Sequence, residues 1–209
     1  MFEPSHHRCM IYDGDPCAQL PRIASIAAEH LRINYRCLYL NRPQMVAAFE
    51  SNLAEARVDT VEAVRRGALV LSSDQAHLVD GIFDPQRMLA MLRSAVRQAS
   101  SNGFAGLWAS GDMLWEFGSE RNLSKLLAYE VGVQELMEQE PTLRGVCQYH
   151  RDSLPANAVL VALYTHQALH VKDRLHWSNP HYRSLTTLRN GSKNTTARVD
   201  EMLHVLRDP

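Results

Sequence analysis

The sequence predicts a three-layer α/β fold, in which a mostly parallel sheet carries helices on both faces. Short apolar runs alternate with segments of helical periodicity along most of the chain, which is the pattern of repeated strand and helix units. The 209 residues are enough for one large domain with a hydrophobic core, but too few for two domains that each bury a sizeable core. No internal repeat or low-complexity tract interrupts the alternation.

The first part of the chain alternates strands and helices over residues 8–72. The apolar run "RCMIY" at 8–12 is closed by the turn-forming residues "DGDP" and predicts the first strand. The helix that follows carries a stripe of apolar residues three and four positions apart: Leu20, Ile23, Ala24, Ala27 and Leu31. The next expected elements are a strand at 36–40, a helix from Pro43 to about Glu55, a short turn of helix in "VEAVRRG" and a strand in "ALVLS".

The second part continues the alternation from residue 84. Asp84 can cap a helix whose first position is Pro85, and apolar residues then repeat on its buried side. The remaining expected elements are a strand at 104–110 that ends at Gly111, a helix over about 122–139, a strand at 145–149, a helix at 158–165 and a short strand at 168–171.

The tail of the chain has a different pattern, which sets the expected domain boundary. "RNGSKN" is a flexible loop by composition, and a last helix can begin near Thr196. We therefore expect one domain over residues 1–188, followed by a loop and a C-terminal helix over 189–209.

The charge, the apolar stretches and the cysteines indicate which partners and which cellular compartment to expect. The 22 basic and 23 acidic residues give a net charge of -1 with no long run of either sign, so the sequence favours neither nucleic acid nor an anionic membrane as a direct partner. No apolar stretch is long enough to span a bilayer, and "MFEPSHHRCM" lacks the order of a signal peptide. The scattered Cys9, Cys17, Cys37 and Cys147 indicate free thiols, so we expect a cytoplasmic protein.

The loop after the first strand argues against nucleotide hydrolysis. A phosphate-binding loop needs glycines, a lysine and a Ser or Thr, because backbone N–H groups and a positive charge must hold the phosphates. Here the loop reads "DGDPCAQLP", with two aspartates and no lysine, and carboxylates repel a triphosphate. No nucleophile elbow and no HExxH motif occurs either, so we expect no enzyme and no cofactor.

Two carboxylates stand out in "GLWASGDMLWEFG" and in the helix after it. Asp112 lies where RecA-like ATPases carry a magnesium-binding acid, but without a phosphate loop it is equally well explained as a turn residue. Glu130 lies on the apolar stripe formed with Leu126 and Val133, so it should face the core and needs a partner there. A structural contact is its first explanation, and a polar anchor in a pocket is the alternative. We expect Asp112 to lie near Glu130.

The histidines raise a metal hypothesis that the sequence does not favour. His7 and Cys9 flank the first strand, and Cys147 and His150 flank the fifth, so two His/Cys pairs could meet if these strands are neighbours. However, Cys147 and His150 should point to opposite faces of their strand. Core thiols and surface imidazoles explain these residues, and we predict no metal site.

Short motifs along the chain resemble, in order, those of the MEDS family, the methanogen/methylotroph DcmR-type sensory domains. The matching segments are "HRCMIYDGD", "LYL", "GALVLSS", "GIFDPQRML", "GFAGLWASGDMLW", "LLAYEVGVQEL", "GVCQYHRDSLP", "ALHV" and "NPHY", which cover about residues 5 to 185. The sequence departs from the family pattern at Trp108, where arginine is expected, and at His150, where aspartate is frequent. The resemblance implies a RecA/KaiC-like fold without a phosphate-binding loop and a role in sensing or signal transduction.

Two functions follow as expectations. The first is a non-catalytic sensory module that binds a small organic ligand at the carboxyl edge of the sheet through Tyr12, Asp112, Trp115, Glu130 and Tyr149, because aromatic walls with a few polar groups suit a small ligand. The resemblance implies a histidine kinase, an anti-sigma factor or a transcription regulator as its signalling partner, and the protein could form a homodimer. The second is a protein-binding regulator with a degenerate nucleotide site, with "VDEMLHVL" as a candidate docking strip.

Overall fold

A computed structural model describes residues 6–76, 78–116, 121–171 and 174–183, and these form a seven-stranded sheet between two layers of helices. The sheet order is β3-β2-β6-β7-β1-β8-β9. Its strands are β1 (His7–Tyr12), β2 (Tyr35–Leu40), β3 (Leu69–Ser72), β6 (Gly106–Asp112), β7 (Leu143–His150), β8 (Ala168–Val171) and β9 (Arg174–His176). All neighbours pair in parallel except β8 and β9, so the predicted mostly parallel sheet is confirmed.

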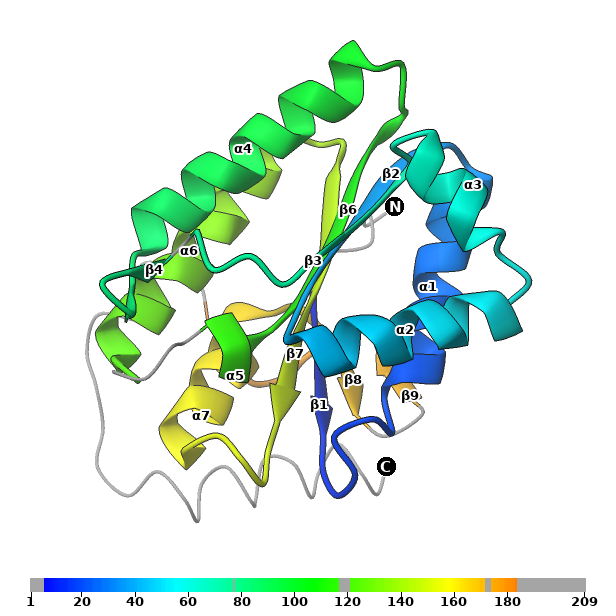
Figure 1. Cartoon of the computed structure of the whole chain (residues 1–209). Coiled ribbons are helices and arrows are strands. Elements are labelled where there is room, and N and C mark those ends of the chain that lie inside the picture. The colour runs from blue at the N-terminus through cyan, green and yellow to red at the C-terminus, as the bar shows by residue number, and fades with distance from the viewer. Residues whose placement is uncertain (1–5, 77, 117–120, 172–173, 184–209) are drawn as a thin grey trace.

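The helices divide between the two faces of the sheet, as Figure 1 shows with the sheet seen edge-on. One face carries α1 (Leu20–Arg32), α2 (Pro43–Glu55) and α3 (Thr60–Arg65). The other carries α4 (Pro85–Ser101), α5 (Met113–Glu116), α6 (Leu123–Gln139) and α7 (Ala156–Thr165). None of the helices in the described part of the chain is both long and apolar enough to cross a membrane.

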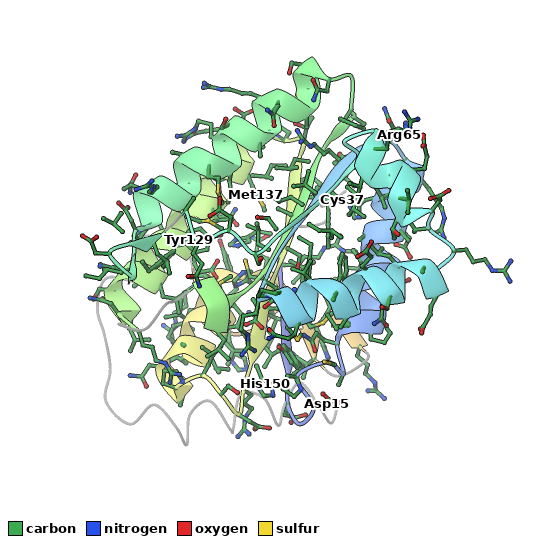
Figure 2. All side chains as sticks on the ribbon, viewed as in Figure 1. Asp15, Cys37, Arg65, Tyr129, Met137 and His150 are labelled. Carbon is green, nitrogen blue, oxygen red and sulfur yellow. The ribbon has the colours of Figure 1, made fainter. Side chains whose placement is uncertain are left out.

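Strand alternation assigns each buried side chain to one of two cores. On β1, Cys9 and Ile11 join the core under α4, α6 and α7, whereas Met10 and Tyr12 join the core under α1 and α2. Figure 2 shows Met137 on the α4 and α6 side of the sheet. Every strand that is covered on both faces therefore supplies side chains to both cores, which explains its nearly continuous apolar sequence.

Most predicted elements are confirmed to within a few residues, because their sequence signals are local. The helix predicted at Pro43–Glu55 has those bounds, and the Asp84 carboxylate caps α4 by accepting from the N–H groups of Gln86 and Arg87. The antiparallel hairpin of β4 (Leu78–Val79) and β5 (Ile82–Phe83), the short α5 and the antiparallel β9 were not predicted. The expected loop and helix of 189–209 and the boundary at 188 lie outside the described residues.

The expected proximity of Asp112 and Glu130 is wrong. Asp112 ends β6 on the face that carries Trp108 and Ser110, toward α1 and α2, whereas Glu130 projects from α6 into the core on the opposite face. The sheet itself separates the two carboxylates. Sequence reasoning placed both near a strand end and could not assign the faces, because β6 is buried on both sides.

Candidate functional site

The residues predicted to bind a ligand fall into two groups. Tyr12 and Asp112 lie at the carboxyl ends of β1 and β6 on the α1 and α2 face. Glu130 and Tyr149 meet on the opposite face, where the Tyr149 hydroxyl donates a hydrogen bond to Glu130 Oε1. Trp115 belongs to α5, and its side chain lies outside the described part of the structure. The structure therefore does not bring the five predicted residues together in one pocket.

A chain of buried amide and hydroxyl groups crosses the strand ends on the α1 and α2 face. The Gln19 side-chain amide donates to Gln148 Oε1 over 3.2 Å, and the Gln148 amide donates to Ser110 Oγ over 3.0 Å. Ser110 in turn donates to the Val146 carbonyl over 2.7 Å. These side chains fill the space beneath the strand ends and tie α1, β6 and β7 together.

Asp112 serves as a turn residue in this structure. Its Oδ1 accepts the N–H of Leu114 over 2.8 Å, which holds the first turn after β6. Burial raises the pKa of Asp112, and the Leu114 amide and the charge of Arg42 offset this only in part. The interpretation of Asp112 as a turn former is thus supported by a specific contact.

Carboxylates accept hydrogen bonds from backbone N–H groups of the loop between β1 and α1. The Gly14 N–H donates to Asp152 Oδ2 over 2.8 Å, and the Cys17 N–H donates to Asp15 Oδ1 over 2.8 Å. Phosphate binding at such a loop depends on free backbone N–H groups and positive charge. The loop geometry therefore agrees with the charge argument from the sequence.

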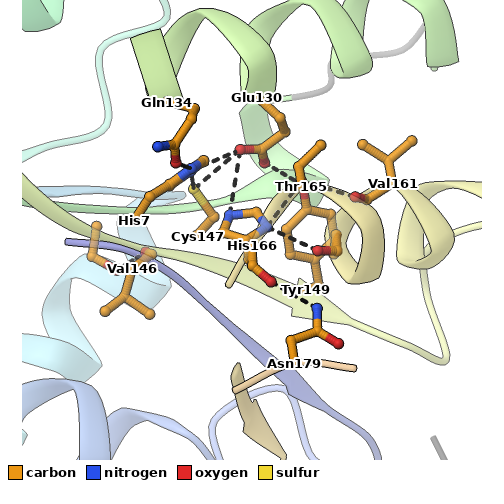
Figure 3. A network of polar contacts seen from close by, with 12 residues as sticks. His7, Glu130, Gln134, Val146, Cys147, Tyr149, Val161, Thr165, His166 and Asn179 are labelled. Atoms are coloured by element: carbon orange, nitrogen blue, oxygen red, sulfur yellow. Dashed lines mark hydrogen bonds and ion pairs between the residues drawn. The ribbon is translucent and has the colours of Figure 1, made fainter. Parts of the chain in front are cut away.

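A second polar cluster is buried in the opposite core, between the sheet and helices α6 and α7 (Figure 3). Glu130 is 0% exposed, and its Oε2 lies 3.1 Å from His7 Nε2 and 3.4 Å from His166 Nε2. Cys147 Sγ lies 3.7 Å from both His7 Nε2 and Glu130 Oε2. Four residues from β1, α6, β7 and the end of α7 thus direct donor atoms to one point.

The fold explains why these four side chains converge. β1 pairs with β7 in parallel, with His7 opposite Gly145 and Cys9 opposite Cys147, so His7 and Cys147 point to the same face of adjacent strands. Helix α6 packs across that face and brings Glu130 to it. The C-terminal end of α7 is fixed by Asn179, whose amide donates to the carbonyls of Leu163 and His166 over 2.6 and 2.7 Å.

Burial determines the charge states in this cluster. Burial lowers the pKa of His166 to about 3, so this imidazole is neutral near pH 7. For Glu130, burial alone would raise the pKa, but His166, His7 and the Tyr149 hydroxyl outweigh it and the pKa is lowered. Burial and the Glu130 charge raise the pKa of Tyr149, which therefore stays protonated and donates.

The residues considered for a metal site pair differently from the sequence expectation. His7 and Cys147 meet each other, together with Glu130 and His166, and all four are buried. Cys9 shares their face, and burial raises the pKa of its thiol well above the usual value. His150 points to the opposite face from Cys147, as expected, and its ring contacts Ser153 Oγ and the Gly14 carbonyl oxygen. The expectation that Cys147 and His150 point to opposite faces of β7 is therefore confirmed.

A small apolar cavity lies beside this cluster, between β6, β7 and helices α4 and α6. Its volume is about 20 Å³. The lining is mainly apolar and rich in thioether side chains, with Leu40, Met88, Leu92, Met113, Val133 and Met137 among its residues. Cys147 also lines the cavity, so one thiol borders both the cavity and the polar cluster.

Sequence reasoning missed His166, Gln134 and the cavity. His166 ends α7, whereas His170, four positions on, lies in β8. A useful signal was present in the apolar helix "AVLVALYT", because a histidine that directly follows such a helix enters the core. The cavity has no local signal, since its lining residues are ordinary core residues in sequence.

Comparisons with known proteins identify the family. The family model of the MEDS domain, "MEthanogen/methylotroph, DcmR Sensory domain", matches residues 6–167. A comparison with curated protein sequences finds no match. Among solved structures, the chain is similar to the flagellar accessory protein FlaH from Methanocaldococcus jannaschii, with 13% identity, a TM-score of 0.53, and coverage of 82% of this chain and 76% of that chain.

The structural likeness concerns the fold alone. It agrees with the predicted α/β architecture of the RecA-like type, built on a mostly parallel sheet. The match over residues 6–167 spans most of the chain and nearly all of the described strands and helices. The chain therefore belongs to the MEDS family, whose members are sensory domains.

Proposed function

We propose that the protein is a non-catalytic sensory module that binds a small, uncharged organic molecule in the cavity between β6, β7, α4 and α6. The observation that supports this proposal is the cavity, whose apolar lining and small volume suit such a ligand. An apolar void of this kind stays free of water when it has few polar partners to offer and can take up an apolar guest. Membership of a sensory family supports the same function.

The size of the cavity and the chemistry of its lining restrict which ligands can bind. A volume of about 20 Å³ is little more than one water-sized probe requires, so the guest has few non-hydrogen atoms. Met88, Met113 and Met137 can repack around it because thioether side chains are flexible and polarisable. A charged ligand would lose its hydration without compensation from this lining.

The position of the cavity suggests how binding is transmitted. Its lining residues come from the sheet and from helices α4 and α6. A bound ligand would therefore change how these helices pack against the sheet. A ligand shifts a conformational equilibrium only by its differential affinity for the two states. The receiving protein in this proposal is a histidine kinase, an anti-sigma factor or a transcription regulator.

The test is a thermal-shift titration with a matched pair of variants. The panel holds chloroform, acetone and xenon as uncharged probes, with methylammonium and acetate as charged ones. Val133→Ile adds a methylene at the cavity wall, and Val61→Ile adds the same group at a helical position that is 77% exposed. We expect uncharged probes to raise the Tm of the native protein and of Val61→Ile, and to leave that of Val133→Ile nearly unchanged.

Two results would contradict the proposal. One is a panel in which no uncharged probe stabilises the native protein. The other is equal stabilisation of the Val133→Ile and Val61→Ile variants, because the probe would then bind outside the cavity.

A second candidate is a protein-binding regulator with a degenerate nucleotide site. The observation that favours it is the loop after β1, where Asp152 and Asp15 accept the N–H groups of Gly14 and Cys17. Equilibrium dialysis with ATP and magnesium should detect no binding to the native protein. Binding that appears in Asp152→Ala would identify this loop as a former nucleotide site, whereas binding to the native protein would contradict both candidates.

A further inference from the structure

The hydrogen-bond partners of His7 and His166 determine which ring nitrogen of each carries a hydrogen. His166 Nδ1 lies 2.9 Å from the Ala162 carbonyl oxygen, which can only accept, so this nitrogen donates. Thr165 Oγ1 donates its own hydrogen to the Val161 carbonyl and therefore also accepts from His166 Nδ1. The other ring nitrogen, Nε2, is the one that faces the cluster.

The same reasoning applies to His7. The Gln134 amide nitrogen donates to Glu138 Oε1 over 2.9 Å, which turns the Gln134 carbonyl oxygen toward His7 Nδ1 at 3.2 Å. An amide oxygen only accepts, so His7 Nδ1 is the donor. Its Nε2 atom lies 3.1 Å from Glu130 Oε2.

Four potential ligand atoms therefore converge on one buried point. His7 Nε2 and His166 Nε2 both face the same carboxylate oxygen, and Cys147 Sγ completes the group. His166 Nε2 is fully buried and has no hydrogen-bond partner among the described residues. The Cys147 thiol can donate its hydrogen to Glu130 Oε2, but no donor among the described residues reaches His166 Nε2, and a metal ion would satisfy this buried atom.

The separations match those of a tetrahedral zinc site. Zinc–nitrogen and zinc–oxygen bonds of about 2.0–2.2 Å and zinc–sulfur bonds of about 2.3 Å give ligand–ligand distances of roughly 3.3–3.8 Å. Four of the six pairs here are separated by 3.1, 3.4, 3.7 and 3.7 Å. All four donor atoms lie within 4.8 Å of one another. Small side-chain shifts would bring every pair into the tetrahedral range.

We propose that His7, Glu130, Cys147 and His166 form a structural zinc site in the core of the domain. A thiolate and a carboxylate carry two negative charges, which Zn²⁺ neutralises, so the loaded site has no net charge in an apolar core. The mixed set of two imidazoles, one sulfur and one carboxylate is typical of zinc among biological metals.

The surroundings of the site define its type. All four ligands are buried and come from the protein, which leaves no open position of the kind that catalytic zinc requires. Gln134 and the Ala162 carbonyl orient the two rings as outer partners do in established zinc sites. Zinc would enter as β1, α6, β7 and α7 assemble, and it would join the first strand of the domain to its C-terminal half.

The experiment measures zinc in the untagged full-length chain, because a histidine tag would itself bind metal. The protein is unfolded in denaturant that contains a chelator, and it is then refolded without metal. It is titrated with Zn²⁺ and, in parallel, with Co²⁺, whose visible spectrum reports tetrahedral geometry and thiolate ligation. The site variants are Cys147→Ser and His166→Gln. The matched controls are Cys17→Ser and His30→Gln. Cys17 is an exposed thiol, and His30 forms a hydrogen bond with the Ile26 carbonyl, away from the site.

We expect one equivalent of zinc and a tetrahedral cobalt spectrum with a thiolate band in the native protein and both controls. Cys147→Ser should lose the thiolate band, and both site variants should lose stoichiometric uptake. Gln134→Ala should bind zinc about 10- to 100-fold more weakly, because it removes the group that orients His7. Refolding that succeeds only when zinc is present supports the proposal as well.

Two outcomes would overturn the zinc site. A chain that refolds without metal and takes up no zinc shows that the cluster holds protons instead. Zinc uptake that is undiminished in Cys147→Ser and His166→Gln places the metal elsewhere.

Discussion

Asp112 and Glu130 are buried carboxylates on opposite faces of one sheet, and their partners differ in kind. Glu130 is surrounded by His7, His166 and the Tyr149 hydroxyl, whereas Asp112 accepts a backbone N–H from Leu114. Burial raises the pKa of Asp112, but the pKa of Glu130 is lowered despite burial. The folded state therefore disfavours the charge on Asp112 and accommodates the charge on Glu130.

Removal of the Asp112 charge should stabilise the protein near neutral pH. An asparagine at this position can still accept the Leu114 N–H, so Asp112→Asn keeps the turn and removes the buried charge. Because the folded-state pKa is raised, the cost of ionisation is fully present at neutral pH and vanishes below the unfolded-state pKa. Urea denaturation should show a gain on the order of 1 kcal/mol near pH 7 that shrinks in acid. A loss of stability near pH 7 would mean that a cation depends on this carboxylate.

Loss of the Tyr149 hydroxyl should destabilise the protein, whereas loss of the Tyr12 hydroxyl should not. Tyr149 donates to a fully buried carboxylate, and its removal leaves Glu130 Oε1 without that donor. The Tyr12 hydroxyl is buried without a hydrogen-bond partner among the described residues. We expect Tyr149→Phe to lower the free energy of unfolding by about 1–3 kcal/mol and Tyr12→Phe to leave it unchanged or raise it. Equal effects of the two substitutions in denaturant melts would contradict the assigned roles.

His170 should make the protein sensitive to mild acid. Burial, with the charges of Arg22 and Arg8, lowers its pKa to about 4. The unfolded chain takes up this proton near pH 6.5 and the folded chain only near pH 4, so stability falls as the pH drops between these values, by up to about 3 kcal/mol. His170→Leu should flatten this part of the stability curve. An unchanged slope in the variant would show that other groups cause the acid response.

The sequence predicts the order of strands and helices well because its signals are local. Asp84 before Pro85, and Pro43 at the start of α2, act within one turn of helix, and the structure has both helix starts where they were expected. The face to which each side chain points is harder to predict, because strands buried on both sides lack the alternation of apolar and polar residues that would reveal it. Asp112 was therefore expected near Glu130, although the two lie on opposite faces of the sheet.

Convergence of distant residues was predictable only in part. Glu130 on an apolar helical stripe indicated a buried carboxylate that needs partners, and the structure supplies Tyr149 and two histidines. His166 and His7 could not be assigned to it, because their meeting depends on the pairing of β1 with β7 and on the end of α7. The cavity depends on imperfect packing among core side chains, which no sequence pattern encodes.

The methyl resonances of the methionines test the sensory account most directly. Met88, Met113 and Met137 line the cavity, whereas Met10 and Met45 lie in the core on the other face of the sheet and serve as internal controls. With methyl-labelled methionine and xenon or chloroform as the probe, NMR should show saturable shifts of the first three resonances and unchanged positions of the other two. Shifts at Met10 and Met45, or no saturable shift at the cavity methionines, would contradict ligand binding in this cavity.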